Sequence, residues 1–181
     1  MCRVSPRLSG SVVLAAALTA LFFRFRTISY AQTNDEAQIR ALESHFAEAF
    51  KAKDVDRIMA NYEHSPSLAF FDVVPRSEYL GWDAYKRDWQ SFFASIGPIA
   101  SFEVKDLTVS VDGNLAYSYS FQHYLANTKA GGTTKVVGTR DITVRVTDVY
   151  RKRGGKWLIV QEHVSVPVDP QTGKGDFQST P

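Results

Sequence analysis

The chain has almost no cysteine and few histidines. Cys2 is the only cysteine among 181 residues and lies in a segment that we expect to be removed, so the remaining domain can form no disulfide and offers no thiolate nucleophile. The four histidines lack the close spacing of zinc ligands. Glycine-rich phosphate loops are missing too, because Gly131-Gly132 and Gly154-Gly155 are followed by strand patterns and not by helices. We therefore expect neither a metal site nor a cofactor.

Only one apolar run approaches the length of a membrane span, and it is short. It covers residues 11–23, 13 residues against the roughly 20 that a spanning helix needs. Arginines precede it, and the small residues Ser29 and Ala31 occupy the positions that a signal peptidase reads. We expect residues 1–31 to be a signal peptide, cleaved after Ala31 from a protein that is exported to the periplasm or secreted. The alternative is a retained membrane tether, with the uncleaved leader as the only contact with the membrane.

No excess of positive charge remains once the leader is removed. The leader holds four arginines and no acidic residue, which leaves 17 basic and 19 acidic residues in the domain. Nucleic-acid binding requires clustered lysines and arginines against the phosphates, so we expect no nucleic-acid partner. The short run Arg151-Lys152-Arg153 precedes a turn and is interpreted as a solvated hairpin end.

The apolar spacing divides the domain into a helical front and a strand-rich back. Apolar residues recur every three or four positions over 39–50 and predict a first helix that ends at Lys53. Asp54 can cap a short second helix. Residues 68–71 and 78–80 read as two short paired strands, and residues 81–96 as a third helix with an apolar stripe.

Four longer strands follow, separated by turns that contain glycine or asparagine and favour hairpins. They cover residues 101–111, 115–127, 135–151 and 157–168. Helices followed by strands are typical of an α+β domain, in which helices cover one face of a bent sheet. We assign 37–168 to this domain, 32–36 to an N-terminal linker and 169–181 to a flexible tail with too little apolar content to pack.

The last predicted strand becomes polar toward its end. A two-residue period puts Trp157, Ile159, Gln161, His163 and Ser165 on one face, which grades from apolar to polar. Such a face is typical of the wall of a half-open pocket. The histidine can move protons near neutral pH, or it can make a structural hydrogen bond at the mouth of the pocket.

Several segments, in this order and spacing, carry a family resemblance. They are Phe46-Ala47-Glu48-Ala49-Phe50, Asp54-Val55-Asp56-Arg57-Ile58-Met59 with Tyr62, Phe70-Phe71-Asp72, Tyr79-Leu80-Gly81-Trp82, and Gly155-Lys156-Trp157-Leu158-Ile159 with His163-Val164-Ser165. Over about residues 37–167 the sequence resembles the SnoaL-like branch of the nuclear transport factor 2-like superfamily, which includes ketosteroid isomerases, scytalone dehydratase and polyketide cyclases. The resemblance implies a cone-shaped fold, in which three N-terminal helices pack on a strongly curved, mainly antiparallel sheet and enclose a pocket. It also implies a homodimer formed through the outer face of the sheet.

Asp72 is the strongest chemical candidate. It follows the apolar residues 68–71, where burial would disfavour the ionised carboxylate and raise its pKa toward that of a general base. It also lies nine residues before Gly81, as the general base of the isomerases lies before its matching glycine. The alternative is that Asp72 only opens a turn toward Pro75.

The chain departs from the isomerase pattern at both oxyanion donors. Phe46 stands where the isomerases have a tyrosine, and Val144 or Arg145 where they have a second, protonated aspartate. We therefore do not expect steroid isomerisation by that pair of donors. Arg145 could bind a carboxylate or an enolate if it points inward, and otherwise is an ordinary exposed arginine of a strand.

The remaining candidates are aromatic or polar residues at strand or helix spacing. They can line a ligand pocket or belong to the core, and His123 can line either the pocket or a dimer surface. The predicted site comprises the catalytic residues Asp72 and His163 and the pocket residues Tyr62, Tyr79, Trp82, Trp89, Tyr119, His123, Arg145 and Gln161.

Two functions of different class remain, with a third behind them. The first is an exported domain that binds a hydrophobic or aromatic small molecule without turnover. The second is a cofactor-free isomerase, cyclase or dehydratase, in which Asp72, alone or with His163, moves a proton next to a carbonyl. The third is a homo-oligomeric assembly module, because one scaffold can serve all three purposes.

Overall fold

The computed structural model describes residues 34–74, 78–131 and 133–179. The described residues from Glu36 onward form one compact unit. The predicted signal peptide, 1–31, and the first residues of the predicted linker lie outside the described residues. Within the described part of the chain, no helix has both the length and the apolar character needed to cross a membrane.

Three helices form where the apolar spacing predicts them. The first is described over 34–52, α2 covers Val55–Met59 and α3 covers Trp82–Ser95. The first helix ends at Lys53, whose φ of 56° is left-handed, and the Asp54 amide donates to the Ala49 carbonyl at 2.9 Å. The Asp54 side chain then caps α2 by accepting a hydrogen bond from the Arg57 amide at 3.0 Å, as predicted.

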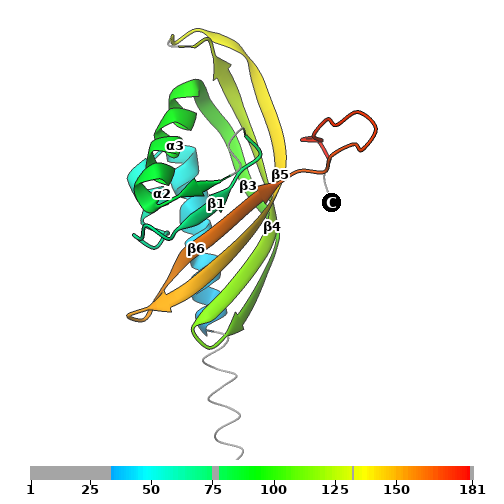
Figure 1. The fold of residues 1–181 in the computed structure, drawn as a ribbon. Helices are drawn as coiled ribbons and strands as arrows, with labels where there is room; N and C mark the ends of the chain where they lie inside the picture. Colours follow the sequence, from blue (N-terminus) through cyan, green and yellow to red (C-terminus); the bar gives the residue numbers. More distant parts are fainter. Residues whose placement is uncertain (1–33, 75–77, 132, 180–181) are drawn as a thin grey trace, which may run out of the picture. The chain divides into compact units, whose positions relative to one another are not determined.

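One mixed sheet of six strands carries the rest of the fold (Figure 1). Its strands are β1 (Ala69–Phe71), β2 (Tyr79–Leu80), β3 (Ile96–Asp112), β4 (Leu115–Lys129), β5 (Val136–Arg153) and β6 (Lys156–Ser165). The order across the sheet is β2-β1-β6-β5-β4-β3, and every pair is antiparallel except β1 with β6. The predicted α+β fold and its mainly antiparallel curved sheet are therefore confirmed.

Strand β3 begins five residues earlier than the predicted start at 101 and runs through Pro98. Proline gives no amide to a ladder, but β3 is the outermost strand at its end of the sheet and needs partners on one side only. Three register shifts interrupt its pairing with β4, the last of them beside Asp106, whose φ is 52°. Such bulges bend a strand and increase its twist, which contributes to the curvature of the sheet.

A register shift in β6 overturns the predicted polar face of that strand. Val149 pairs with Gln161, and the next residue of β5, Tyr150, pairs with Ile159, so Val160 is an extra residue on β6. An extra residue reverses which side chains face inward beyond it. Ile159 is 2% exposed and Glu162 5% exposed, whereas His163 is exposed. The alternation assumed from Trp157 to Ser165 was wrong beyond Ile159.

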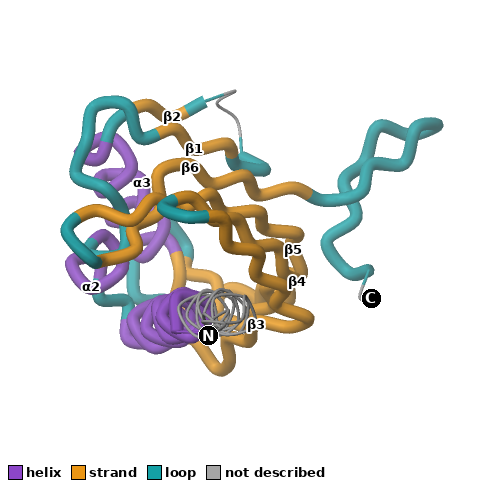
Figure 2. The backbone as a smooth tube through the Cα atoms, turned by 90° about the horizontal axis from the view of Figure 1, so that it is seen from below, coloured by secondary structure: helices purple, strands orange, loops and turns teal. Residues whose placement is uncertain are grey.

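The helices lie on the concave side of the sheet (Figures 1 and 2). Between the two layers is a core that is rich in aromatic rings. Its buried members include Ile39, Phe46, Phe50, Ile58, Met59, Tyr85, Phe93, Tyr150, Trp157 and Ile159. This core leaves a cavity, and the candidate site lies there.

The segment after 168, predicted to be a flexible tail, contacts the domain. Val168 pairs with Gly175, and the Asp176 amide donates to the Pro167 carbonyl at 2.8 Å. The Thr143 amide of β5 donates to the Phe177 carbonyl at 2.8 Å, at a position beyond the end of the pairing between β5 and β6. The segment therefore contacts β5 beyond the point where its pairing with β6 stops. Its mobility stays a prediction.

Deleting residues 169–181 is expected to speed hydrogen exchange at the Thr143 amide by on the order of 10-fold or more, because this amide loses its acceptor. The amides of residues 145–149, which pair with β6, are the internal control and should exchange at an unchanged rate. Exchange measured by NMR checks this prediction. Unchanged protection of Thr143 would show that the terminal segment does not hold this edge in solution.

Candidate functional site

A cavity of about 480 Å³ lies between the helices and the concave face of the sheet. Most of its wall is apolar and largely aromatic, with a few polar groups among the rings. Its lining residues are Phe46, Phe50, Phe70, Asp72, Val73, Val74, Tyr85, Asp88, Trp89, Phe92, Ser95, Phe102, Gln122, Tyr124, Arg140, Ile142, Val144, Glu162, Val164 and Phe177. A concave apolar site with a few polar groups is the usual form of a small-molecule pocket.

Strand pairing places Asp72 in this cavity. In the parallel pair of β1 with β6, Phe70 lies beside Glu162 and Phe71 beside His163. Phe70 is buried and points inward, whereas Phe71 is exposed and packs edge-on against His163 with the ring centroids 5.6 Å apart. Alternation then turns Asp72 inward, next to Glu162 along the same wall.

The surroundings of Asp72 favour its protonated form. Burial raises the pKa of the Asp72 carboxyl, the hydrogen bond from the Val73 amide at 2.6 Å opposes this, and the charge of Asp88 adds to the rise. The position of Asp72 in the cavity is observed, whereas a turn toward Pro75 lies partly outside the described residues and stays a prediction. A carboxyl in this state can accept or hold a proton at a bound ligand.

Glu162 is the second carboxyl of the cavity. The Tyr85 hydroxyl donates to Glu162 Oε1 at 2.9 Å, and the Tyr62 hydroxyl makes a short hydrogen bond to Oε2. Burial raises the pKa of Glu162, while the hydrogen bonds from Tyr62 and Tyr85 work in the opposite direction. Burial and the nearby charge of Glu162 raise the pKa of both tyrosines well above the usual range, so both remain donors.

Two further carboxyls lie behind Glu162. Asp148 pairs directly across from Glu162 on β5, and burial and the Glu162 charge raise its pKa well above the usual range. Burial likewise raises the pKa of Glu43, on the first helix, to about 7. The Tyr150 hydroxyl donates to Glu43 Oε1 at 2.6 Å and lies 2.7 Å from Ser118 Oγ. In this carboxyl cluster (Glu43, Asp148 and Glu162), burial raises the pKa of each carboxyl and so favours its protonated form.

Replacing Tyr85 by phenylalanine is expected to raise the pKa of Glu162 further and to lower the free energy of unfolding by about 1–3 kcal/mol, since a buried carboxylate loses a donor. The pKa can be followed by NMR of the glutamate carboxyl carbon and the stability by urea unfolding. Tyr124→Phe is the control, because Tyr124 lines the same cavity but donates no hydrogen bond to Glu162 among those described. An unchanged titration of Glu162 in Tyr85→Phe would contradict the assignment.

Of the aromatic residues Tyr62, Tyr79, Trp82 and Trp89, all predicted to line the pocket, only Trp89 lines the cavity. Tyr62 lies behind the wall, on Glu162, and Tyr79 packs against Phe70 with ring centroids 5.5 Å apart. Trp82 donates its indole N–H to a backbone carbonyl at 3.1 Å and stacks on an imidazole at 4.3 Å, outside the cavity. The prediction that Tyr62, Tyr79 and Trp82 line the pocket is therefore wrong, because their side chains lie behind or outside its wall.

The other predicted pocket residues lie on the opposite face of the sheet. Phe121 pairs with Arg145, Tyr119 with Thr147, and Thr147 in turn with His163, and directly paired residues share a face. Tyr119 is 49% exposed. The residues next to them in sequence face the concave side of the sheet instead. The pocket placement predicted for Tyr119, His123, Arg145, Gln161 and His163 is therefore wrong.

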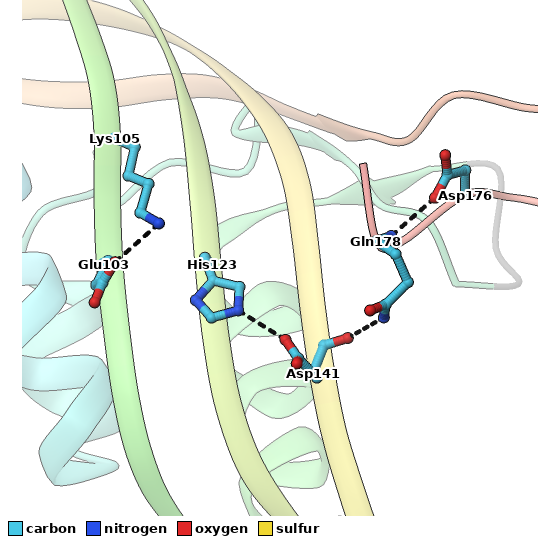
Figure 3. A network of polar contacts seen from close by, with 6 residues as sticks. All are labelled: Glu103, Lys105, His123, Asp141, Asp176 and Gln178. Carbon is cyan, nitrogen blue, oxygen red and sulfur yellow. Dashed lines mark hydrogen bonds and ion pairs between the residues drawn. The ribbon is translucent and has the colours of Figure 1, made fainter. Parts of the chain in front are cut away.

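His123 has a partner on that outer face. Its Nε2 lies 2.7 Å from Asp141 Oδ1, and the Gln178 amide nitrogen donates to the Asp141 carbonyl at 2.5 Å (Figure 3). The Asp176 carboxylate in turn accepts from the Gln178 backbone amide at 2.9 Å. These contacts tie β4, β5 and the terminal segment together, so the structure gives His123 a structural hydrogen bond.

The polar residues of the cavity that sequence patterns missed are Glu162, Tyr85, Asp88, Ser95, Gln122, Tyr124 and Arg140. The available signal for Glu162 was an acidic residue that shares a strand face with Val160 and Val164 in the last predicted strand, since a charge is rarely buried without a partner. Strict alternation instead placed the two residues beside it, Gln161 and His163, in the pocket and Glu162 on the opposite face. Within the described residues, no group of three His, Cys, Asp or Glu side chains is arranged to hold a metal ion.

Comparison with known proteins agrees with this geometry. The family model for the SnoaL-like domain matches residues 39–169. An NTF2-like protein of unknown function from Pseudomonas putida is 29% identical, with a TM-score of 0.69 over 82% of this chain and 98% of that one. An NTF2-like superfamily protein from Salmonella enterica is 20% identical, with a TM-score of 0.66 over 80% and 99%. A ketosteroid isomerase-like protein from Erwinia carotovora is 21% identical, with a TM-score of 0.57 over 71% and 93%. No curated protein matches.

Proposed function

The chain belongs to the SnoaL-like domain family of the nuclear transport factor 2-like superfamily, and from that premise we propose that its cavity binds a small hydrophobic or aromatic molecule. The observation that carries the proposal is the cavity itself, with aromatic rings around two inward carboxyls, Asp72 and Glu162. Rings supply apolar contact area, while a few polar groups fix the orientation of a ligand.

A thermal-shift screen against naphthalene, steroid and polyketide-like compounds tests the proposal, because a ligand of the folded state raises the melting temperature by mass action. Asp72→Asn should weaken any hit, since it changes a group in the wall of the cavity. His163→Ala is the control on the outer face and should leave the hit unchanged. A hit that responds to His163→Ala and not to Asp72→Asn would overturn the choice of site.

A second candidate function is cofactor-free proton transfer on the bound molecule. It is favoured by the position of Asp72, whose pKa is raised by burial and which faces the ligand space. Asp72 would take a proton from the carbon next to a carbonyl and return it elsewhere on the same molecule. His163 cannot assist from the outer face, so the second proton-carrying group would be Glu162 with its tyrosine donors.

If the protein turns over its ligand, Asp72→Asn should lower kcat by a factor on the order of 100 or more while the ligand still binds, as for loss of a general base. A pure binding domain would show a change of affinity only. Steady-state kinetics on each thermal-shift hit, beside its dissociation constant, separate the two functions. Full turnover by Asp72→Asn would remove Asp72 from the chemistry.

Export and dimerisation complete the proposal. Export rests on the leader pattern of residues 1–31 and is tested by sequencing the N-terminus of the exported protein.

A homodimer through the outer sheet face is supported by exposed apolar residues there, including Leu115, Tyr117 and Tyr119. Light scattering of Tyr119→Arg should report a monomer where the parent is a dimer. A monomeric parent would contradict both the dimer and the assembly role.

A further inference from the structure

Phe177 belongs to the terminal segment (residues 169–179), yet it lines the cavity. Its carbonyl accepts a hydrogen bond at 2.8 Å from the Thr143 amide of β5, and the two residues beside Thr143 in sequence, Ile142 and Val144, line the cavity as well. The pairing of β5 with β6 ends at Arg145, so no residue of β6 pairs with β5 at this position. Phe177 therefore contributes to the cavity wall at an edge where β6 no longer pairs.

A turn brings the chain back from the end of β6 to this edge. The Asp169 amide donates to the Lys174 carbonyl at 2.9 Å, and Val168 pairs with Gly175 in the antiparallel direction. The terminal segment, red in Figure 1, leaves β6 at its end and contacts β5 there. Phe177 follows Gly175 by two residues, so the turn returns it to the point where β6 stops.

The Phe177 ring is closely packed within the terminal segment. A Cβ atom at Gly175 would lie 3.2 Å from Phe177 Cε2 and 3.1 Å from Val166 Cγ2, which is shorter than an ordinary contact between carbon atoms. Glycine at this position therefore leaves room for both side chains. The next residue, Gln178, is fixed as well, because its side-chain amide donates to the Asp141 carbonyl at 2.5 Å (Figure 3). Contacts on both sides of Phe177 thus hold its ring in place.

The ring of Phe177 can offer a ligand only shape and apolar contact, since it carries no polar group. The cavity has a volume of about 480 Å³, within the range of roughly 300–1,000 Å³ that is usual for small-molecule pockets. In an apolar pocket, one methylene more or less changes the discrimination between ligands by a factor of about 10 or more. A whole ring in the wall is therefore sufficient to select ligands by their length.

We propose that Phe177 is a specificity-determining residue, whose ring closes the cavity at the β5 edge and limits how far the body of a bound ligand extends there. The proposal rests on the proposed binding function, and it names the feature that selects among hydrophobic ligands. The terminal segment is then part of the binding site, because it holds the selecting ring.

Two phenols that share one end and differ in length test the proposal on the full chain. 5,6,7,8-Tetrahydro-2-naphthol corresponds to the first two rings of 17β-estradiol, which carries two further rings. Calorimetric titration gives the dissociation constant of each phenol. Phe177→Ala should raise the affinity for 17β-estradiol relative to the tetrahydronaphthol by on the order of 10-fold or more, because the opened wall leaves space for the additional rings.

A larger ring and a matched control locate the effect. Phe177→Trp enlarges the group in the wall and should change the affinity ratio in the opposite direction. Phe71→Ala removes the same side chain from the outer face of the sheet, where it packs against His163, and should leave the ratio unchanged. Circular dichroism of each variant shows that it is folded before it is titrated.

The position of the ring can also be measured in the free protein. Nuclear Overhauser contacts are expected from the ring protons of Phe177 to the methyl groups of Val166, and to those of Ile142 or Val144 in the cavity wall. If the ring showed no contact with either cavity residue, it would not form part of the wall in solution, and the proposal would be overturned whatever the affinities are.

The outcomes separate this inference from the proposed function. An affinity ratio that rises in Phe177→Ala, falls in Phe177→Trp and stays constant in Phe71→Ala supports both. Binding that Asp72→Asn weakens, with a ratio that neither Phe177 variant changes, overturns the role of Phe177 and leaves the binding function standing. An equal change of the ratio in Phe71→Ala would also overturn that role. Binding of neither phenol by the parent or by Phe177→Ala would contradict both.

Discussion

Replacing Phe50 by alanine is expected to lower the free energy of unfolding by about 3–5 kcal/mol, the range for a large side chain removed from a packed core. Phe50 is 4% exposed and forms the centre of the aromatic core. Its ring contacts Phe46, Trp89, Phe92, Phe93, Phe102 and Tyr124, with centroid distances between 4.2 and 6.2 Å. It joins the first helix, α3 and the sheet, so its loss opens the cavity wall as well as the core.

Urea unfolding measures this change, with Tyr117→Ala as the control. Tyr117 is an aromatic residue of β4 that is 48% exposed on the outer face, and its replacement should change the stability by about 0.5 kcal/mol or less. Equal losses in the two variants would mean that the aromatic core does not hold the layers together as the structure shows.

The free energy of unfolding is expected to fall by about 3 kcal/mol as the pH rises from 4.5 to above 7, because of Glu43. Its pKa is about 7 in the folded protein against an ordinary value of 4.5, so the folded state keeps a proton that the unfolded chain has lost. Stability from this group is therefore fully present below pH 4.5 and is lost as the pH rises through 7. The raised pKa values of Asp148 and Glu162 act in the same direction.

Glu43→Gln isolates the contribution of this carboxyl. Glutamine keeps an oxygen for the Tyr150 hydroxyl but cannot ionise, so the variant should lose much less stability between pH 5 and pH 8 than the parent. Urea unfolding at intervals of one pH unit gives both curves. Parallel curves for parent and variant would contradict a proton held at Glu43.

Local sequence signals were sufficient for most of the fold. Apolar spacing and the Asp54 cap predicted the helices to within a few residues, and the glycine turns predicted the long hairpins. Asp72 was identified as an acid in apolar surroundings, which the parallel pairing of β1 with β6 explains. These features depend on neighbours in sequence or on one hairpin, so a local pattern can report them.

One extra residue explains the misplacement of Gln161 and His163. Val160 shifts the register of β6, and no feature of its sequence marks it as a bulge. Strict alternation therefore assigned Gln161 and His163 to the pocket and left Glu162 outside. His123 and Arg145 were likewise assigned to the wrong face of the sheet, because the side on which each lies depends on which face the helices cover.

The carboxyl cluster could not be found from local patterns. Its hydrogen bonds join residues that are 77, 100 and 107 positions apart, between the helices and the last two strands. Each carboxyl taken alone reads as an ordinary polar residue of a helix or strand. Only the packing of the helices on the concave face brings the three together and makes their burial costly.

A two-dimensional ¹H–¹⁵N NMR titration with a naphthalene compound that raises the melting temperature tests most directly whether the cavity is the functional site. Binding in the cavity should shift the amide signals of Asp72 and Gln122 and the indole N–H of Trp89, which lines the cavity and is buried with no hydrogen-bond partner among the described residues. Signals of Tyr119 and His163, on the outer face, should stay in place. Shifts concentrated at Tyr119 and His163, with Asp72 and Trp89 unmoved, would place binding on the outer face and contradict the cavity as the site.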